Sequence, residues 1–427
     1  MKIIKVMKHL LYVTLTVLAI SCSSEIDNTY IANENHIKKE YSISINELKS
    51  YLSEHNNSLT RNFNYDVQPV ISDKDTVLYV VNYEDGWEVF SADVRAPRVF
   101  AKSDSGKVSE TDFSSIPALK ILYESFINNV KYLKDNPELK VNPTFVDRWE
   151  TTAIPQKTFD RAKDIKTRSG EYEVLQSHLL QTKWGQGSPW NIRAPYTDET
   201  LSEHCLTGCG PVAMAQLLYY LHSQNDIQYT PYSDSYTYKY IPNGNSYIQL
   251  SYSDVTFTAP SGNAEAIWGS MPINKYSTGS FEAVSTLMID MGIASLSEYY
   301  PSSTSTYSSD VESGLMHRCH LTVFSDNADF DLLSDMIVQD NNPAILLIGY
   351  RNSSNIWLYG HYVVADAIKE QYSSSNQLIS RWVGFNWGYD GQYDNLWLST
   401  DVINWTSNSF YNSISCMIYN YSIESNI

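Results

Sequence analysis

One short stretch combines a cysteine with the local features that would make it reactive. Cys209 lies between two glycines in residues 207–211, Thr-Gly-Cys-Gly-Pro, and apolar residues at helical spacing follow over 212–223. Pro211 suits a first helical position, so Cys209 is expected just before the helix starts. There the unpaired backbone N–H groups and the helix dipole favour a thiolate. The stretch therefore predicts a nucleophile, against the common alternative that a free cysteine is a small core residue.

A cysteine nucleophile needs a base, and the base needs an orienting group. Among nine histidines, His361 alone opens a β-rich run, residues 362–366, so a strand would hold its imidazole. A second such run, residues 383–388, carries Asn386 and Trp387. Asn386 can accept a hydrogen bond from the His361 ring, and Trp387 can shield that bond from water. Taken singly, a strand histidine is more often structural and Asn-Trp-Gly is more often a turn.

The order of these motifs along the chain resembles that of the papain-like cysteine peptidases, and their local sequences resemble the streptopain family in particular. The resemblance extends over nearly the whole chain after Asp75. Several stretches match the family closely or look similar to it. These are 184–191, 207–209 with 213–216, 360–361 and 386–388, together with the similar segments 291–293, 299–303 and the hairpin at 80–93.

The resemblance implies a role for each matching residue. Cys209 would be the nucleophile and His361 the general base and acid. Gln186 would be an oxyanion-hole donor, while Asn386 and Trp387 would orient and shield the base. The implied fold is α+β and papain-like, with a helical part that carries Cys209 and an antiparallel sheet that carries His361. The implied reaction needs neither a metal nor a cofactor.

Two departures from the family pattern lie close to these residues. Gly210-Pro211 follows the cysteine, where the family commonly has a small apolar pair. The last motif ends Tyr389-Asp390-Gly391, where the family has Trp-Gly-Gly. Neither departure removes a catalytic group, but Asp390 is expected to place a negative charge near the cleft.

The N-terminus predicts export. Three lysines precede an apolar run at 10–20 that is too short to span a bilayer comfortably, which is typical of a signal peptide over 1–21. A small residue directly before Cys22 resembles a lipoprotein lipobox, and residues 23–27 resemble the acidic export tag of some surface lipoproteins. We therefore expect lipidation at Cys22 and an outer-membrane lipoprotein at the cell surface or in the periplasm, with release after maturation as an option. The alternative is an ordinary cleaved signal.

The rest of the chain divides by composition. Residues 22–60 are polar and form a lipidated tether and the start of the pro-region. Two β-rich runs around a glycine turn, followed by an amphipathic helix that opens at Pro117, predict a small α+β domain over 61–150. Residues 151–170 are basic and poor in large apolar side chains, as in a cleavable linker. Residues 171–427 would form the catalytic domain, and the resemblance makes 61–150 its inhibitory pro-domain.

Composition restricts the partners. The net charge of -18 argues against nucleic acid, which binds basic surfaces. No stretch after the signal is long and apolar enough for a membrane helix, so membrane contact is expected through the lipid alone. With Cys22 lipidated and Cys209 free, the other three of the five cysteines cannot form a disulfide framework. Cys205 lies four residues before Cys209, so a reversible bond between the two could switch activity off.

These features predict a secreted or surface-anchored cysteine endopeptidase, made as a zymogen and acting on polypeptides, with its own pro-domain as intramolecular inhibitor. Two alternatives remain open. The 33 Tyr and 10 Trp also suit a surface lipoprotein of degenerate peptidase fold that binds glycan or protein. The same catalytic groups also serve another papain-like amide hydrolase or a transpeptidase.

Overall fold

The computed structural model describes residues 41–55, 64–139, 165–166, 172–197, 202–224, 268–351, 354, 357–407 and 414–423. Tyr41–Ile427 form one compact unit, and residues 1–40 lie outside the described residues. The predicted signal peptide and Cys22 lie within these residues. Most of the predicted linker at 151–170 also lies outside the described residues.

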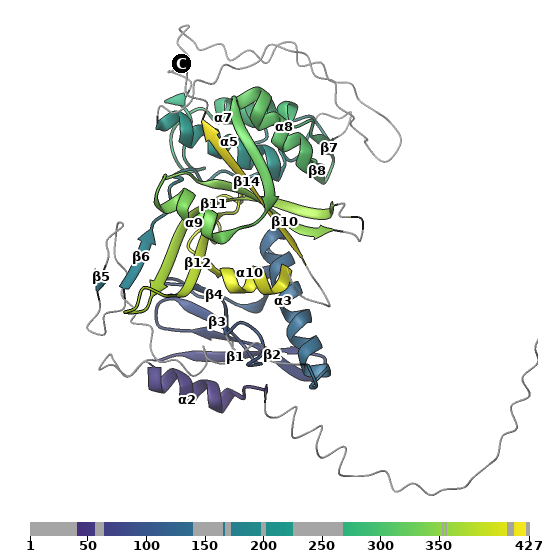
Figure 1. Ribbon diagram of the computed structural model, residues 1–427. Coiled ribbons are helices and arrows are strands. Elements are labelled where there is room, and N and C mark those ends of the chain that lie inside the picture. The colour runs from purple at the N-terminus through teal and green to yellow at the C-terminus, as the bar shows by residue number, and fades with distance from the viewer. Residues whose placement is uncertain are drawn as a thin grey trace, which may run out of the picture. The chain divides into compact units, whose positions relative to one another are not determined.

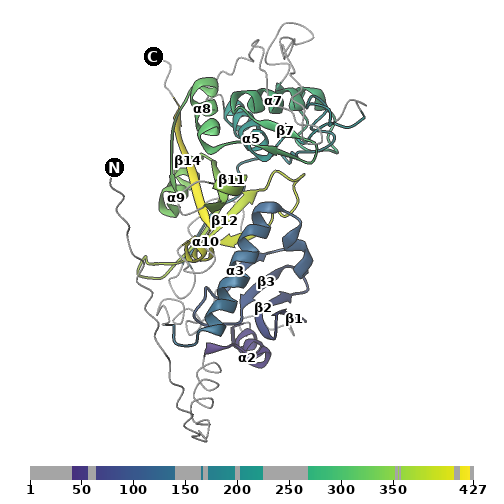
Figure 2. The same ribbon diagram turned by 90° about the vertical axis from the view of Figure 1, so that its right-hand side faces the viewer.

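The predicted pro-domain, residues 61–150, is a four-stranded antiparallel meander with α3 on one face, and α2 from the preceding segment 22–60 packs on the other face (Figures 1 and 2). Alternation along the second strand explains the two faces, because successive side chains point to opposite sides. Val80 packs in the cluster that includes α3, whereas Tyr79 and Val81 pack in the cluster that includes α2. The elements are α2 (Ile45–His55), β1 (Asp66–Ser72), β2 (Asp75–Asn82), β3 (Trp87–Ser91), β4 (Val99–Ser103), the 3-10 helix η1 (Glu110–Ser114) and α3 (Pro117–Asp135).

Local sequence signals explain where these elements begin. A capping box opens α2: Ser44 N donates to Glu47 Oε2 at 2.7 Å, and Glu47 N donates to Ser44 Oγ at 3.3 Å. Gly86 has a φ of 85° in the turn between β2 and β3. Pro117 opens α3 as predicted, where its missing N–H is no loss.

The predicted catalytic domain contains most of a larger antiparallel sheet, in the order β1-β2-β3-β4-β13-β12-β11-β10-β14-β9. A short strand within the predicted linker, β5 (Ile165–Lys166), pairs with β6, which pairs with β11. The strands are β6 (Tyr172–Gln176), β9 (Leu321–Asn327), β10 (Ala344–Arg351), β11 (Trp357–Tyr372), β12 (Leu378–Asn386), β13 (Trp397–Ser399) and β14 (Ser415–Ile423).

Helices α5, α7 and α8 pack together at one end of this sheet, and α5 also packs against β11 (Figure 1). Helix α5 is buried on nearly all sides, which its continuous apolar sequence explains. This mixture of helices and antiparallel strands confirms the predicted α+β class. The elements are α5 (Cys209–Ser223), α7 (Phe281–Ala294), α8 (Ser308–Cys319), α9 (Phe330–Val338), α10 (Thr400–Ser407) and the hairpin β7 (Glu298–Tyr300) and β8 (Ser303–Ser305).

The meander continues directly into the larger sheet. Strand β4 pairs with β13, with Lys102 opposite Trp397 and Ala101 opposite Leu398. The Phe126 ring of α3 also packs against Trp405 of α10, with centroids 5.2 Å apart. The two predicted domains therefore share one sheet and one hydrophobic core.

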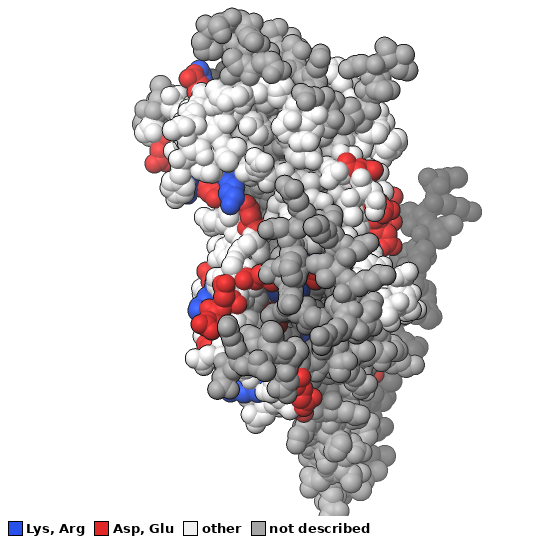
Figure 3. Space-filling model, turned by 90° about the vertical axis from the view of Figure 1, so that its left-hand side faces the viewer, with Lys and Arg blue, Asp and Glu red and all other residues white. Residues whose placement is uncertain are grey.

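Among the charged side chains of the described residues on the face drawn in Figure 3, acidic ones cover more of the surface than basic ones, which are scattered between them. This agrees with 48 acidic against 30 basic residues in the chain. Such a surface suits a basic partner better than a phosphate backbone.

Candidate active site

Helix α5 begins at Cys209 itself, with Gly208 as its N-cap. The prediction that Cys209 precedes the helix, with Pro211 at its first position, was wrong by two residues. Pro211 is the third helical residue, whose N–H also lacks a partner within the helix, so proline is tolerated there. Gly208 has a φ of 95°, and a Cβ on it would lie 2.8 Å from Thr304 Cγ2 of β8. Glycine is therefore required to expose the cysteine at this turn.

The Cys209 sulfur lies half-buried beside His361 of β11. Burial alone would raise the pKa of the thiol, but the neighbouring His361 charge and its hydrogen bond bring that pKa below the usual value. The backbone N–H groups of Tyr362 and Gly210 also donate to the sulfur and act in the same direction. The structure thus brings the two predicted residues together and favours a thiolate.

The His361 ring is oriented by a backbone carbonyl. Its Nε2 lies 3.4 Å from Trp387 O, a group that can only accept a hydrogen bond. This contact keeps the proton on Nε2 and leaves Nδ1 for the sulfur. The side chain is 4% exposed, so the contact is protected from water.

The predicted hydrogen bond between His361 and Asn386 is not formed. Asn386 Nδ2 donates to Thr182 O at 2.7 Å and to Gln216 Oε1 at 3.0 Å. Its Oδ1 accepts from Gln216 Nε2 and from Gly388 N, both at 3.0 Å. A side-chain amide can make four hydrogen bonds, and Asn386 uses all four here. His361 pairs instead with the backbone carbonyl of the next residue, Trp387.

Gln216 is a residue whose role the sequence argument missed. It lies in the buried middle of α5, exchanges two hydrogen bonds with Asn386, and accepts a third from Trp184 N at 3.3 Å. It thereby ties the helix that carries Cys209 to the strand that leads to Trp387. A lone amide inside an otherwise apolar helix was the available signal.

Trp387 contributes more than its carbonyl. Its ring is fully buried beside Phe385, with centroids 5.1 Å apart, and its Nε1 donates to Tyr393 O at 3.1 Å. These contacts fix the peptide that faces His361. Its predicted shielding role stays a prediction.

Gln186 is positioned through the turn that precedes the cysteine. Its carbonyl accepts hydrogen bonds from Thr207 N at 2.9 Å and from Thr207 Oγ1 at 3.3 Å. Its side chain offsets part of the rise that burial causes in the pKa of the Tyr389 hydroxyl. The predicted oxyanion donor therefore lies in the same network as Cys209.

The hydroxyls of three tyrosines respond to the charge of the sulfur, and the sequence argument assigned none of them to the site. They are Tyr359, Tyr362 and Tyr389. Burial raises the pKa of each hydroxyl, and the negative charge on Cys209 raises it further. Among 33 tyrosines, their positions beside His361 and the Asn-Trp-Gly motif were the only signal.

The charge of Asp390 is neutralised where it lies. Its Oδ1 accepts a hydrogen bond from Trp190 Nε1 at 2.6 Å, and its Oδ2 forms an ion pair with Lys275 Nζ at 3.3 Å. A Cβ on Gly185 would lie 2.5 Å from the same carboxylate, so this glycine makes room for it. Asp390 therefore supports the site rather than adding net charge to it.

The four described cysteines are all free. Cys205 is buried, and burial raises its pKa to about 11. Its sulfur contacts Tyr196 O at 3.8 Å. The structure therefore contains no bond between Cys205 and Cys209, and the proposed redox switch stays a prediction.

The described part of the chain contains neither a candidate metal site nor a candidate membrane helix. No group of three or more His, Cys, Asp or Glu residues within it could hold a metal ion. None of its helices combines the length and apolarity needed to cross a bilayer.

Comparison with known proteins identifies the family. The model of the peptidase C10 family matches residues 184–397, a span that contains Gln186, Cys209, His361, Asn386 and Trp387. The chain belongs to the peptidase C10 family. This C10 peptidase is 23% identical to streptopain of Streptococcus pyogenes over 346 residues, which cover 74% of the chain and 72% of streptopain.

A solved structure extends the likeness to the N-terminal part of the C10 peptidase. A fragment of prointerpain A from Prevotella intermedia, carrying a cysteine-to-alanine mutation, aligns with a TM-score of 0.52 and 21% identity. The alignment covers 83% of this chain and 98% of the fragment. The C10 peptidase is thus a cysteine-type peptidase, and its papain-like fold resembles that of the prointerpain A fragment.

Proposed function

We propose that this C10 peptidase is an exported cysteine endopeptidase that hydrolyses polypeptides through an acyl-enzyme on Cys209. The observation that carries the proposal is the position of Cys209 at the start of a buried helix, where the charge of His361 and two backbone N–H groups lower the pKa of the thiol. This is the arrangement that nucleophilic catalysis by a thiolate needs.

The reaction proceeds in two steps. The Cys209 thiolate attacks a peptide carbonyl, and the new oxyanion is held by the Cys209 N–H and the Gln186 amide. A donor of this kind contributes about 3 to 4 kcal/mol in known cases. Protonated His361 then gives its proton to the leaving amine as the C–N bond breaks. In the second step His361 takes a proton from water, whose oxygen displaces the sulfur and releases the acid.

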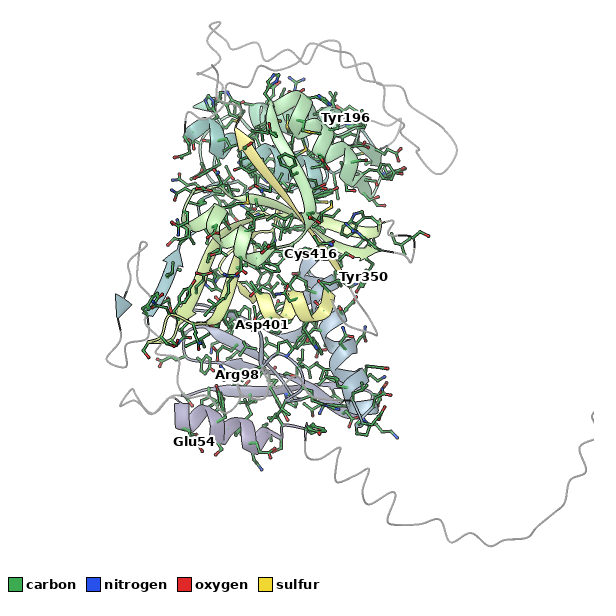
Figure 4. All side chains as sticks on the ribbon, in the orientation of Figure 1. Glu54, Arg98, Tyr196, Tyr350, Asp401 and Cys416 are labelled. Atoms are coloured by element: carbon green, nitrogen blue, oxygen red, sulfur yellow. The ribbon has the colours of Figure 1, made fainter. Side chains whose placement is uncertain are left out.

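Contacts of the pro-domain support its role as an inhibitor. The Tyr393 hydroxyl, in the loop after Trp387, interacts with the side chains of Asp112 and Ser115; burial, followed by Asp112, raises its pKa. On another side, Tyr350 of β10 donates to Ile121 O of α3 at 3.5 Å; Figure 4 labels this tyrosine. The pro-domain thus contacts both the loop and the sheet that position the base. We infer that cutting the 151–170 linker frees this loop and sheet from the pro-domain.

Export and lipidation at Cys22 are part of the same proposal. They are supported by the charged and apolar N-terminal sequence and by the small residue before Cys22. A lipid on Cys22 would tether the pro-form to a membrane, and cleavage of the linker would then free the catalytic domain.

Replacement of the nucleophile tests both the chemistry and the maturation. We expect Cys209→Ala to abolish casein hydrolysis while circular dichroism and the thermal midpoint stay close to those of wild type. Wild-type protein should shorten on incubation, and the variant should stay full length, as read by mass spectrometry. The same spectra report lipidation and the mature N-terminus.

Each result bears on one part of the proposal. Casein hydrolysis by a purified Cys209→Ala protein would refute the acyl-enzyme. If both proteins stay full length without added protease, the chain does not cut itself, although another peptidase could still mature it. Cys205→Ala is the matched control, and it should hydrolyse casein like wild type.

A further inference from the structure

Thr304 of β8 contacts the turn that presents Cys209. Its Oγ1 donates a hydrogen bond to Leu206 O at 2.6 Å. Its Cγ2 lies where a Cβ on Gly208 would be only 2.8 Å away, so the missing side chain of this glycine lets the turn and the threonine meet. One side chain of the hairpin thus touches the turn through both its hydroxyl and its methyl group.

The hydrogen bond from Thr304 fixes one end of a peptide group whose other end is also held. Leu206 O and Thr207 N belong to the same peptide group, and Thr207 N donates to Gln186 O at 2.9 Å. Because a peptide group is planar, hydrogen bonds at its opposite ends set the orientation of the whole plane. The Thr304 hydroxyl and the backbone of the candidate oxyanion donor therefore hold the same peptide.

The chain beyond this peptide needs such support. Gly208 has a φ of 95°, and Gly210 follows the cysteine. Glycine loses more conformational freedom on folding than any other residue, and neither glycine has a side chain that could hold the turn. A peptide plane that is free to rotate would let Cys209 vary its distance from His361. Misplacement of a reacting group by about 1 Å can lower a rate by about a hundredfold.

The hairpin that carries Thr304 is itself fixed on two sides. The hydroxyls of Thr306 and Ser297 share a hydrogen bond of 2.8 Å, and those of Ser297 and Ser295 share one of 3.1 Å. Ser295 Oγ also donates to Met291 O of α7 at 2.8 Å. On the other side, the hydroxyl of Tyr362 in β11 donates to Thr306 O at 3.3 Å. The support for the cysteine turn is therefore joined to α7 and to the strand that carries the base.

We propose that Thr304 is a positioning residue for the Cys209 nucleophile. Its hydroxyl holds the peptide between residues 206 and 207, and this keeps the sulfur beside His361. The proposal rests on the proposed function, because Cys209 and His361 have their roles in acyl transfer. Thr304 acts through the turn, so its hydroxyl rather than its bulk should matter for the rate.

Three variants of the full chain test this role. Thr304→Val keeps the shape of the side chain and loses the hydroxyl. We expect its kcat on a fluorogenic peptide to fall about three- to tenfold, the effect of one neutral hydrogen bond, with little change in KM. Thr304→Ser keeps the hydroxyl and should retain the kcat of wild type. Thr306→Val is the matched control, because it removes a hydroxyl that bonds to Ser297 and not to the turn. It should lower the thermal midpoint about as much as Thr304→Val does and leave kcat unchanged.

Alkylation of Cys209 gives a second readout that needs no peptidase activity. In the full-length proteins, the pH midpoint of alkylation by iodoacetamide should move upward in Thr304→Val, because the sulfur lies less constantly beside His361. It should stay unchanged in Thr304→Ser and Thr306→Val. The measurement uses unprocessed chains, so a variant that fails to mature is still tested.

A change in either readout that occurs in Thr304→Val alone supports the proposal. Wild-type kcat together with a wild-type midpoint in Thr304→Val would overturn it, as would an equal change in Thr306→Val. An equal loss in Thr304→Ser would show that the hydroxyl is not responsible, and this too would overturn it. If wild-type protein leaves peptides intact, the proposed function fails, while the alkylation midpoints still decide the role of Thr304.

Discussion

At the scale of single residues, the reactivity of Cys209 arises from opposing effects. Burial of the thiol disfavours the charged form, while the charge of His361 and two backbone donors favour it, and the favouring contacts prevail. His361 in turn depends on the Trp387 carbonyl, which selects the ring nitrogen that carries the proton. The nucleophile therefore depends on groups that lie more than a hundred residues away in sequence.

The pH dependence of Cys209 alkylation follows from this balance. With iodoacetamide, the alkylation rate should rise with a midpoint below about 8.5, the ordinary thiol value, since His361 lowers the pKa. In His361→Ala the charge is lost and burial remains, so the midpoint should move upward. Peptide mass spectrometry measures the modification at Cys209 alone. Equal midpoints in both proteins would show that His361 does not stabilise the thiolate.

At the scale of elements, one amide pair joins α5 to the end of β12. Gln216 and Asn386 exchange two hydrogen bonds at 3.0 Å, and both side chains are at most 3% exposed. Buried polar groups are costly when unpaired, so this pair favours a single register between helix and strand. Asn386 thus acts as a link between elements, which differs from the role that the family resemblance implied.

Removal of one amide tests this link. Gln216→Leu would remove two of the four hydrogen bonds of the buried Asn386 amide and the side-chain acceptor of Trp184 N, and we expect a loss of about 2 to 3 kcal/mol in the free energy of unfolding. Gln224→Leu, at the exposed end of the same helix, should change it by less than about 0.5 kcal/mol. Urea denaturation followed by tryptophan fluorescence compares them. Similar midpoints for the two variants would contradict this role.

At the scale of the whole molecule, the pro-domain and the catalytic domain meet along β4 and β13. Lys102 of β4 lies over the Trp382 ring, 4.3 Å from its centroid, and Lys369 forms an ion pair with Asp104 at 3.0 Å. Burial, followed by repulsion from Lys369, lowers the pKa of Lys102 to about 8. Burial at this junction therefore disfavours the charged form of Lys102, relative to a lysine exposed to water.

This lowered pKa predicts a stability that depends on pH. Between about pH 8 and the ordinary lysine value near 10.4, the unfolded chain binds a proton that the native state does not, so the contribution of Lys102 to stability rises with pH. Lys102→Met should therefore gain stability relative to wild type at pH 7 and lose that advantage by about pH 10.5. Thermal midpoints of the full-length Cys209→Ala form, which should not cut itself, measure this. Lys120→Met, at an exposed position on α3, is the control and should show no such trend.

Local patterns were enough to predict the elements near each motif. The capping residues of α2, the Gly86 turn and the proline that opens α3 act over a few residues, so sequence alone indicates them. The α+β, papain-like fold of the whole chain was implied by the family resemblance, and periodicity indicated only the small α+β domain over 61–150. The start of α5 was placed two residues late, because proline is tolerated throughout the first turn of a helix and does not mark its first residue.

The sequence by itself determined which side chains carry the chemistry, because reactivity belongs to residue types: a cysteine in a glycine turn, and a histidine and an Asn-Trp-Gly motif on strands. Only the tertiary structure decided how these groups are paired. It joins His361 to the Trp387 carbonyl, Asn386 to Gln216, and the Leu206 carbonyl to Thr304. Hydrogen bonds depend on distance and direction in space, and a carbonyl or a threonine gives no sign of its partner until the chain has folded.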